Sequence, residues 1–178
     1  MHTWLALIRG INVGGRNKLP MTTLSRILEQ AGCVAVRTYI QSGNVVFASP
    51  SKSKKALVKR LGEAIETEFK FRPGILLLSA ADFHAAVPNN PFPHAVENPQ
   101  SLHFFFLESP PKSADLAGIA KLAASSERYG LIDTVFYLHA PDGIGRSKLA
   151  AGVERKLGVA VTARNYATVQ KLAEMLAG

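Results

Sequence analysis

The sequence has a single cysteine in 178 residues, so no disulfide can form within the chain. A protein of an oxidising compartment usually carries several cysteines, and we therefore expect a cytoplasmic protein. Long hydrophobic runs are also missing, since none approaches the roughly 18 apolar residues of a membrane-spanning helix. The apolar N-terminal stretch stops at Arg9 without a basic region or a cleavage site, which indicates a first strand rather than a signal peptide. We expect no contact with a membrane.

Acidic residues are scarce, with 13 Asp and Glu against 21 Lys and Arg, and the formal net charge is +8. This excess favours an anionic partner, although charge alone does not identify one. The histidines are few and show neither the spacing of metal ligands nor neighbouring acids: His2, His84, His94, His103 and His139. We expect no metal site and no cofactor.

The chain is globular, because 47% of its residues are hydrophobic and its length suffices for one domain or two small ones. In residues 1–80 the patterns predict strand, helix, strand, strand, helix and strand. Pro20 is expected to open the first helix and Gly32 to end it. The expected elements are strands at 3–9, 36–41, 45–49 and 74–79, and helices at 20–31 and 53–69.

The same order returns in residues 81–178, after a short helix at 80–86 and a proline-rich irregular connection at 88–99. The expected elements are strands at 102–107, 128–131, 134–139 and 159–162, and helices at 113–124, 147–157 and 165–176. The predicted fold class is therefore α+β, a tandem pair of ferredoxin-like (βαββαβ) units packed into one compact protein. The first unit would span residues 1–80 and the second residues 81–178.

The segment Phe104–Leu107 is apolar at every position, which predicts a strand covered on both faces. Covered sheets leave the loops and the helix ends as the places where a ligand can bind.

The strongest candidate is the loop Gly10–Leu19, which joins a strand to a helix and carries three glycines, Arg16 and Lys18 without an acid. Glycines let backbone N–H groups turn towards an oxyanion, and a helix N-terminus adds partial positive charge. The loop departs from the phosphate-loop pattern, because Arg16 and Asn17 stand where lysine and a hydroxyl are required, and this excludes a nucleoside triphosphatase. The alternative is a loop whose glycines only make a tight turn.

A second basic loop, Asp142–Leu149, again runs from a strand to a helix. Its Arg146-Ser147-Lys148-Leu149 ending echoes Arg16-Asn17-Lys18-Leu19. We expect Ser147 to cap the helix, and the nearby cations would be relieved by a bound anion. A solvated helix start is the alternative.

Ser42 lies in Gln41-Ser42-Gly43-Asn44, between two expected strands. It lacks the surroundings of a nucleophilic serine, so we interpret the segment as a hairpin turn. Gln41 and Asn44 remain possible polar contacts for a ligand.

Several short motifs together resemble the bacterial family called domain of unknown function 1697. They are Arg9–Gly15, Tyr39–Phe47, Asn90–Phe92, Gly145–Leu149 and Thr162–Asn165. The resemblance implies a tandem pair of ferredoxin-like units and no established activity. Family members usually have Trp-Asn after the last motif, where this sequence has Tyr166-Ala167.

We therefore expect a non-catalytic binder of an anionic ligand, which is a nucleotide, a phosphorylated metabolite or a nucleic-acid segment. An anionic small molecule ranks above nucleic acid, because Trp4 and Phe47 are the only aromatic residues of the first half that could stack bases and core packing explains both. The expected contacts are Arg9, Gly10, Asn12, Gly14, Gly15, Arg16, Asn17, Lys18, Gln41, Ser42, Asn44, Gly145, Arg146, Ser147, Lys148, Arg164 and Asn165.

Two other functions stay open. A small enzyme acting on a phosphorylated or carboxylated substrate would need an acid or base, for which the loops offer Tyr39, Tyr166, His139 and Asp142. A protein-interaction module, as a monomer or a homodimer through an edge strand, is the third.

Overall fold

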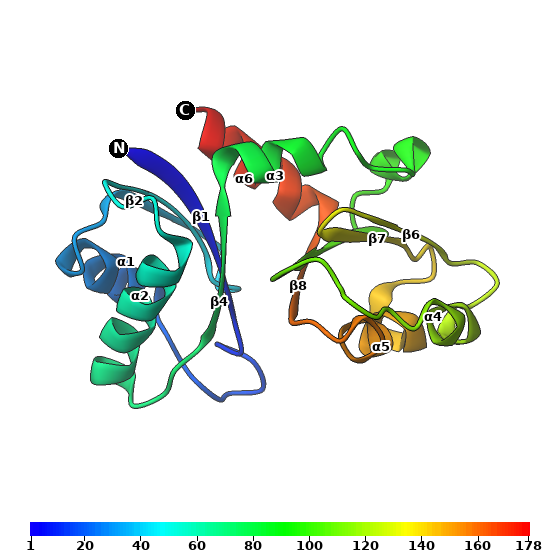
Figure 1. The fold of residues 1–178 in the computed structure, drawn as a ribbon, viewed down its shortest axis with the longest axis horizontal. Coiled ribbons are helices and arrows are strands. Elements are labelled where there is room, and N and C mark those ends of the chain that lie inside the picture. Colours follow the sequence, from blue (N-terminus) through cyan, green and yellow to red (C-terminus); the bar gives the residue numbers. More distant parts are fainter. The chain divides into compact units, whose positions relative to one another are not determined.

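The computed structural model describes residues 1–178 as two compact units. The first unit comprises residues 1–85 together with 172–178, and the second comprises residues 86–171. Each unit contains one four-stranded antiparallel sheet (Figure 1). The α+β class predicted from the sequence is confirmed, and none of the helices is long and apolar enough to cross a membrane.

In the first unit the sheet has the strand order β2-β3-β1-β4. Helices α1 and α2 lie together on one side of this sheet (Figure 1). The elements are β1 (His2–Arg9), α1 (Met21–Gln30), β2 (Val34–Tyr39), β3 (Asn44–Ser49), α2 (Lys54–Phe69), β4 (Gly74–Ser79) and α3 (Ala80–Ala86).

In the second unit the sheet has the order β6-β7-β5-β8, so corresponding strands occupy the same places in the two sheets. The elements are the 3₁₀ helix η1 (Pro93–Glu97), β5 (Leu102–Leu107), α4 (Leu116–Leu122), β6 (Arg128–Ile132), β7 (Val135–His139), the 3₁₀ helix η2 (Ile144–Arg146), α5 (Lys148–Leu157), β8 (Val161–Asn165) and α6 (Tyr166–Ala177), whose residues from 172 onwards belong to the first unit. The order of strands and main helices predicted for each half is confirmed.

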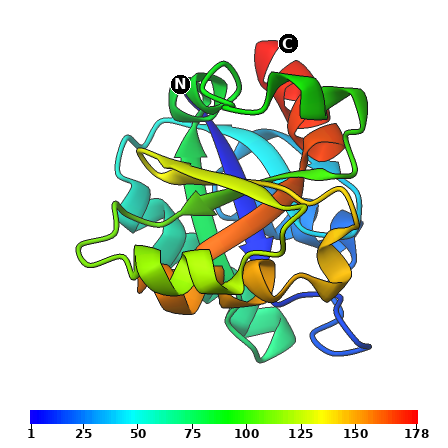
Figure 2. The same ribbon diagram turned by 90° about the vertical axis from the view of Figure 1, so that its right-hand side faces the viewer.

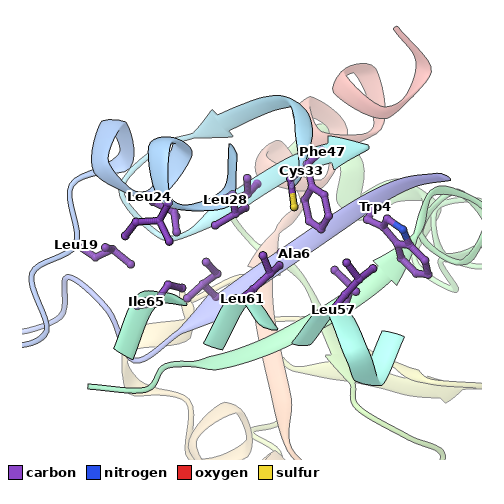
Figure 3. Close-up of a cluster of buried hydrophobic side chains, with 14 of the residues drawn as sticks. Trp4, Ala6, Leu19, Leu24, Leu28, Cys33, Phe47, Leu57, Leu61 and Ile65 are labelled. Atoms are coloured by element: carbon purple, nitrogen blue, oxygen red, sulfur yellow. The ribbon is translucent and has the colours of Figure 1, made fainter. Parts of the chain in front are cut away.

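The core of the first unit forms because one face of the buried strand β1 meets the apolar faces of the amphipathic helices α1 and α2. Trp4, Ala6 and Ile8 are buried on the side of the sheet that carries the helices. Figure 3 shows Leu24 and Leu28 of α1 and Leu57, Leu61 and Ile65 of α2 packing over β1. Each buried leucine of this kind stabilises the fold by about 2 kcal/mol. Cys33 belongs to the same core, and burial raises the pKa of its thiol, which favours a structural role for this cysteine over a reactive one.

Strand β5 is buried at all six positions, as the run of apolar residues predicted. Phe104 packs edge-on against Tyr137 of β7, with 4.7 Å between the ring centroids. Burial, and to a lesser extent Asp133, raises the pKa of Tyr137 to about 12, so its hydroxyl stays protonated and donates to the carbonyl of Ala86. The central strands therefore present no aromatic surface for stacking bases.

The start of α1 differs from the prediction. Pro20 is the N-cap residue and not the first helical residue, because its backbone is extended, with ψ at 137°, while its carbonyl accepts the hydrogen bond from Leu24 N. The predicted end of the helix is correct. Cys33 N donates to Leu28 O and Gly32 N to Glu29 O, the pair of bonds of a glycine-terminated helix.

Candidate functional site

The loop Gly10–Leu19 forms a small hairpin at the end of β1. Arg16 N donates to Val13 O at 3.0 Å and Asn12 N to Asn17 O at 3.1 Å. The two residues of the turn, Gly14 and Gly15, have φ of 57° and 76°, a conformation that residues with a side chain rarely adopt. Figure 2 shows this loop, in blue, standing out at the end of its unit. The tight turn that the glycines predicted is therefore present.

Asn12 anchors this hairpin. Its Oδ1 accepts from Leu19 N at 2.8 Å, and its Nδ2 donates to Leu19 O at 3.0 Å and to Gln41 O at 2.9 Å. A second amide, that of Asn17, donates to Gly10 O at 2.8 Å. Asn12 and Asn17, which we expected to contact a ligand, therefore hold the loop in shape with their amide groups.

The turn between β2 and β3 lies beside the same loop. Ile8 N of β1 donates to Gly43 O at 2.7 Å. A Cβ atom at Gly43 would lie only 2.8 Å from Ile11 Cδ1 and 2.9 Å from Ile8 O. With the bond from Asn12 to Gln41, these contacts bring together two predicted site segments, Arg9–Lys18 and Gln41–Asn44.

Asn44 lies beneath this turn and is fully buried. Its Nδ2 donates to Tyr39 O at 3.0 Å and to Ser42 Oγ at 2.9 Å. The Ser42 hydroxyl thus takes part in the turn, in agreement with the interpretation of this segment as a hairpin. Asn44, like Asn12, therefore holds the backbone of the site in place with its side-chain amide.

The exposed part of the site consists of the hairpin tip and of two residues in the adjoining turn between β2 and β3. Arg16 and Lys18 are exposed, as are Gln41 and Ser42. The N–H groups of Gly14 and Gly15 donate no hydrogen bond within the loop. Arg9 is half-buried at the end of β1, and the stem of its side chain covers Gly74, where a Cβ would lie 2.6 Å from Arg9 Cγ.

Helix α1 begins directly after this loop without a capping side chain. Proline has no side-chain acceptor, and the first turn of α1 contains no acidic residue. The first acidic residue of the whole chain is Glu29, near the end of this helix. The N–H groups at the start of α1 and the basic hairpin before it therefore form one electropositive end of the first unit.

The second basic loop has a different position in its own unit. It follows β7, which is the third strand of its unit in chain order, whereas Gly10–Leu19 follows β1, the first strand of its unit in chain order. Because first and third strands run antiparallel in both sheets, these loops leave opposite ends of their sheets. The likeness of Arg16–Leu19 to Arg146–Leu149 is therefore one of sequence and not of position in the fold.

Ser147 caps α5, as predicted, by accepting from Ala150 N at 2.9 Å. Gly145, Arg146 and Lys148 surround this helix start, with Arg146 ending η2. The loop belongs to the second unit.

Arg164 and Asn165 end β8. Asn165 caps α6 by accepting from Thr168 N at 2.9 Å and donates to Gln100 Oε1 at 2.7 Å. Burial lowers the pKa of Arg164 to about 10, which still leaves the guanidinium charged at neutral pH. Since β7 and β8 both run antiparallel to β5, Asn165 and the loop after His139 lie at the same end of the second sheet.

The acid and base candidates of the second unit each contact a different neighbour. The ring of His139 lies against Phe92, with 6.4 Å between centroids, and that of Tyr166 lies 5.7 Å from Phe104. Asp142 accepts a hydrogen bond from Ser126 Oγ at 2.6 Å. These contacts assemble no pair of groups for proton transfer, and no cluster of three potential ligands for a metal ion is present.

One cavity was not predicted from the sequence. A cavity of about 400 Å³ lies in the second unit between η1 and the end of β7. It is bordered by the Asn90–Phe92 motif, which the sequence analysis had singled out without assigning it a contact.

Taken together, the fold and the loops define a small α+β protein with two βαββαβ units and an anchored, glycine-rich basic hairpin. The chain belongs to the family described as "Protein of unknown function (DUF1697)", whose model matches residues 1–137, and the resemblance stated from the motifs is confirmed.

A solved structure described as the conserved bacterial protein SP0830 from Streptococcus pneumoniae is similar to this chain. The two sequences are 27% identical, the TM-score is 0.72, and the match covers 100% of this chain and 99% of that one. No curated protein matches the chain. Neither the family description nor the similar structure names a ligand or a reaction.

Proposed function

We propose that this protein is a non-catalytic binder of an anionic, phosphorylated small molecule, and that the basic hairpin of the first unit holds the phosphate. The observation that carries the proposal is the uncapped start of α1 beside a hairpin with two exposed cations. Phosphate oxygens accept hydrogen bonds from backbone N–H groups and pair with Arg and Lys.

The site is suited to an anion because its rigid parts and its free parts are separate. The side-chain amides of Asn12, Asn17 and Asn44 donate hydrogen bonds to backbone carbonyls and so fix the hairpin and the adjoining turn. Arg16, Lys18 and the N–H groups of Gly14 and Gly15 remain available to a ligand. A site held in shape before binding loses less conformational entropy when the ligand arrives.

A small ligand suits the molecule better than a nucleic acid. The central strands β1 and β5 are buried, so they offer no aromatic face on which bases could stack. Binding rather than catalysis is favoured because Gly10–Leu19 contains no carboxylate, histidine or tyrosine that could transfer a proton.

We also propose that both units are ferredoxin-like and that they arose by duplication. The support is the shared element order and the matching strand orders β2-β3-β1-β4 and β6-β7-β5-β8. In this proposal the loop Gly145–Lys148 and the end of β8 at Arg164 and Asn165 would be a separate, weaker anion contact, because Ser147 and Asn165 already cap their helices.

The proposal is tested by titrating the protein with inorganic phosphate and pyrophosphate at low ionic strength, using calorimetry. We expect saturable binding that the double variant Arg16→Ala/Lys18→Ala weakens about tenfold or more, since two charge-assisted contacts are lost. The matched control is Lys52→Ala/Lys55→Ala, which removes the same charge from exposed positions at the start of α2. Absence of saturable binding, or equal weakening by both double variants, would show that the hairpin is not an anion site.

A further inference from the structure

The cavity of the second unit has no part in the proposed function, since it lies on other residues and in another unit. Its volume of about 400 Å³ falls at the small end of the range typical of ligand pockets, roughly 300–1,000 Å³. One wall comes from the segment Pro91–Asn98 and the other from His139 and Pro141, at the end of β7.

Hydrogen bonds hold the first wall in place. Asn90 Oδ1 accepts from Phe92 N at 3.0 Å while Asn90 Nδ2 donates to Phe92 O at 3.2 Å, which fixes the backbone of Phe92 from both sides. The same carbonyl accepts from Ala95 N and so begins η1. Pro91 rests on Gly130 of β6, where an added Cβ would lie 3.3 Å from Pro91 Cγ.

A buried serine joins the two walls. Ser101 O accepts from Ala140 N at 2.8 Å, and Ser101 Oγ donates to Asn98 O at 2.8 Å. Ser101 therefore links the residue after η1 to the residue after β7, and these bonds hold the two walls of the cavity together.

The lining combines flat apolar surfaces with a few polar groups. Phe92, Pro93 and Pro141 contribute rings to the lining, and the imidazole of His139 lies beside Phe92 at an interplanar angle of 37°. His94 and Glu97 are three residues apart in η1, and in a 3₁₀ helix such side chains project from the same side. Both border the cavity. A carboxylate accepts hydrogen bonds, whereas an imidazole can donate from one nitrogen and accept at the other.

We propose that this cavity binds a planar heteroaromatic ring that both donates and accepts hydrogen bonds, the chemistry of a purine or pyrimidine base. Flat walls of proline and aromatic side chains select a planar ring, and Glu97 with the two imidazoles distinguishes a hydrogen-bonding ring from a hydrocarbon one. A carboxylate at the edge of the cavity also disfavours a phosphate there. The ring is therefore recognised without its phosphate, if it carries one.

The test uses the four ribonucleosides adenosine, guanosine, cytidine and uridine, none of which carries a phosphate, with indole as a planar ring that has no acceptor. Binding is measured by NMR titration of the full chain. We expect at least one nucleoside to bind saturably at the resonances of residues 91–98 and 139–141, and indole to bind at least tenfold more weakly.

The variant Glu97→Ala is expected to weaken nucleoside binding about tenfold, because a hydrogen bond to a charged acceptor is lost. Glu108→Ala is the matched control, since Glu108 is exposed and does not border the cavity. Three results would overturn the proposal: no saturable nucleoside binding, indole binding as tightly as the nucleosides, or equal effects of Glu97→Ala and Glu108→Ala. Because the nucleosides lack phosphate, their binding is independent of Arg16 and Lys18 and of the proposed function.

Discussion

The first helix of each unit begins differently, since α4 has a capping side chain at its N-terminus and α1 has none. The connection from the first strand to the first helix is Gly10–Pro20 in one unit and Glu108–Asp115 in the other. In the second unit Asp115 caps α4 by accepting from Gly118 N at 2.7 Å, and its other oxygen accepts from Lys156 Nζ at 2.6 Å. In the first unit Pro20 offers no acceptor, and the connection carries Arg16 and Lys18.

This difference bears directly on the proposed function. The second unit contains its own anion, the Asp115 carboxylate, placed between a helix N–H group and a lysine. Gly118 makes room for that arrangement, because a Cβ there would collide with both Asp115 and Lys156. The first unit has the N–H groups and the cations but no carboxylate of its own. A bound phosphate would supply at α1 the negative charge that Asp115 supplies at α4.

The largest effect is expected from Gly43→Ala, which attacks the packing of the turn on which the basic hairpin rests. The added Cβ meets Ile8 and Ile11 at 2.8–2.9 Å, and φ at this residue is 78°. We expect a loss of roughly 2–4 kcal/mol in the free energy of unfolding, from the clash and the strained backbone together. Urea denaturation measures it.

The control is Gly145→Ala in the basic loop of the second unit, where nothing lies within 4 Å of an added Cβ and φ is not positive. This change should leave the free energy of unfolding nearly unaltered. If both alanine variants unfold at the same urea concentration as the parent, the turn does not support the hairpin as described.

A smaller loss is expected from Asn12→Ala. The substitution removes the acceptor for Leu19 N and the donor for Leu19 O and Gln41 O. We expect about 2–3 kcal/mol, since bonds of a half-buried amide each contribute about 1 kcal/mol and two carbonyls lose a partner. Asn17→Ala, which removes one exposed bond to Gly10 O, should cost about 1 kcal/mol or less. Equal losses in the two variants, measured by thermal unfolding, would contradict the anchoring role of Asn12.

A feature of the fold could be predicted from the sequence when the interacting residues lie close together along the chain. Gly32 as the end of α1 and Ser147 as the cap of α5 were predicted, because capping acts over three or four residues and leaves a local signature. The element order of both halves was predicted because each strand and helix carries its own periodicity. The elements and many of their ends can therefore be predicted from the local sequence.

The roles of Asn12 and Asn44 could not be predicted in the same way. Asn12 reaches Gln41 across 29 residues, so its bond exists only once β1 and the β2–β3 turn are assembled. In the sequence an anchoring asparagine looks the same as one that contacts a ligand. The cavity was missed for a similar reason, because its two walls, at Pro91–Asn98 and at His139 and Pro141, are separated by the whole of β5, α4 and β6.

The built-in anion of the second unit predicts a dependence of stability on pH. The hydrogen bond from Lys156, and then the one from Gly118 N, hold the pKa of Asp115 below its usual value. A lowered pKa means that the carboxylate stabilises the folded state above the unfolded pKa, about 4, and that this contribution disappears as the pH falls through the folded value. The melting temperature of Asp115→Asn should therefore lie below that of the parent at about pH 6, and the gap should close towards about pH 2. Lys156→Ala should behave alike, and a gap that is constant with pH would refute the pairing.

The smallest change in stability, and the sharpest test of the comparison, is expected from Pro20→Asp. Residue 20 has the extended backbone of an N-cap, so an aspartate there can accept from the first-turn N–H groups of α1 as Asp115 does in α4. We expect a gain of about 0.5–1 kcal/mol in the free energy of unfolding, because a missing cap is supplied next to a helix dipole.

The same carboxylate would repel a phosphate at that place, so phosphate affinity should fall although Arg16 and Lys18 are intact. Pro20→Asn is the control, since it can cap without adding charge and should keep most of the affinity. If Pro20→Asp binds phosphate as well as the parent while Arg16→Ala/Lys18→Ala does not, the anion lies at the hairpin tip alone and the analogy with Asp115 fails.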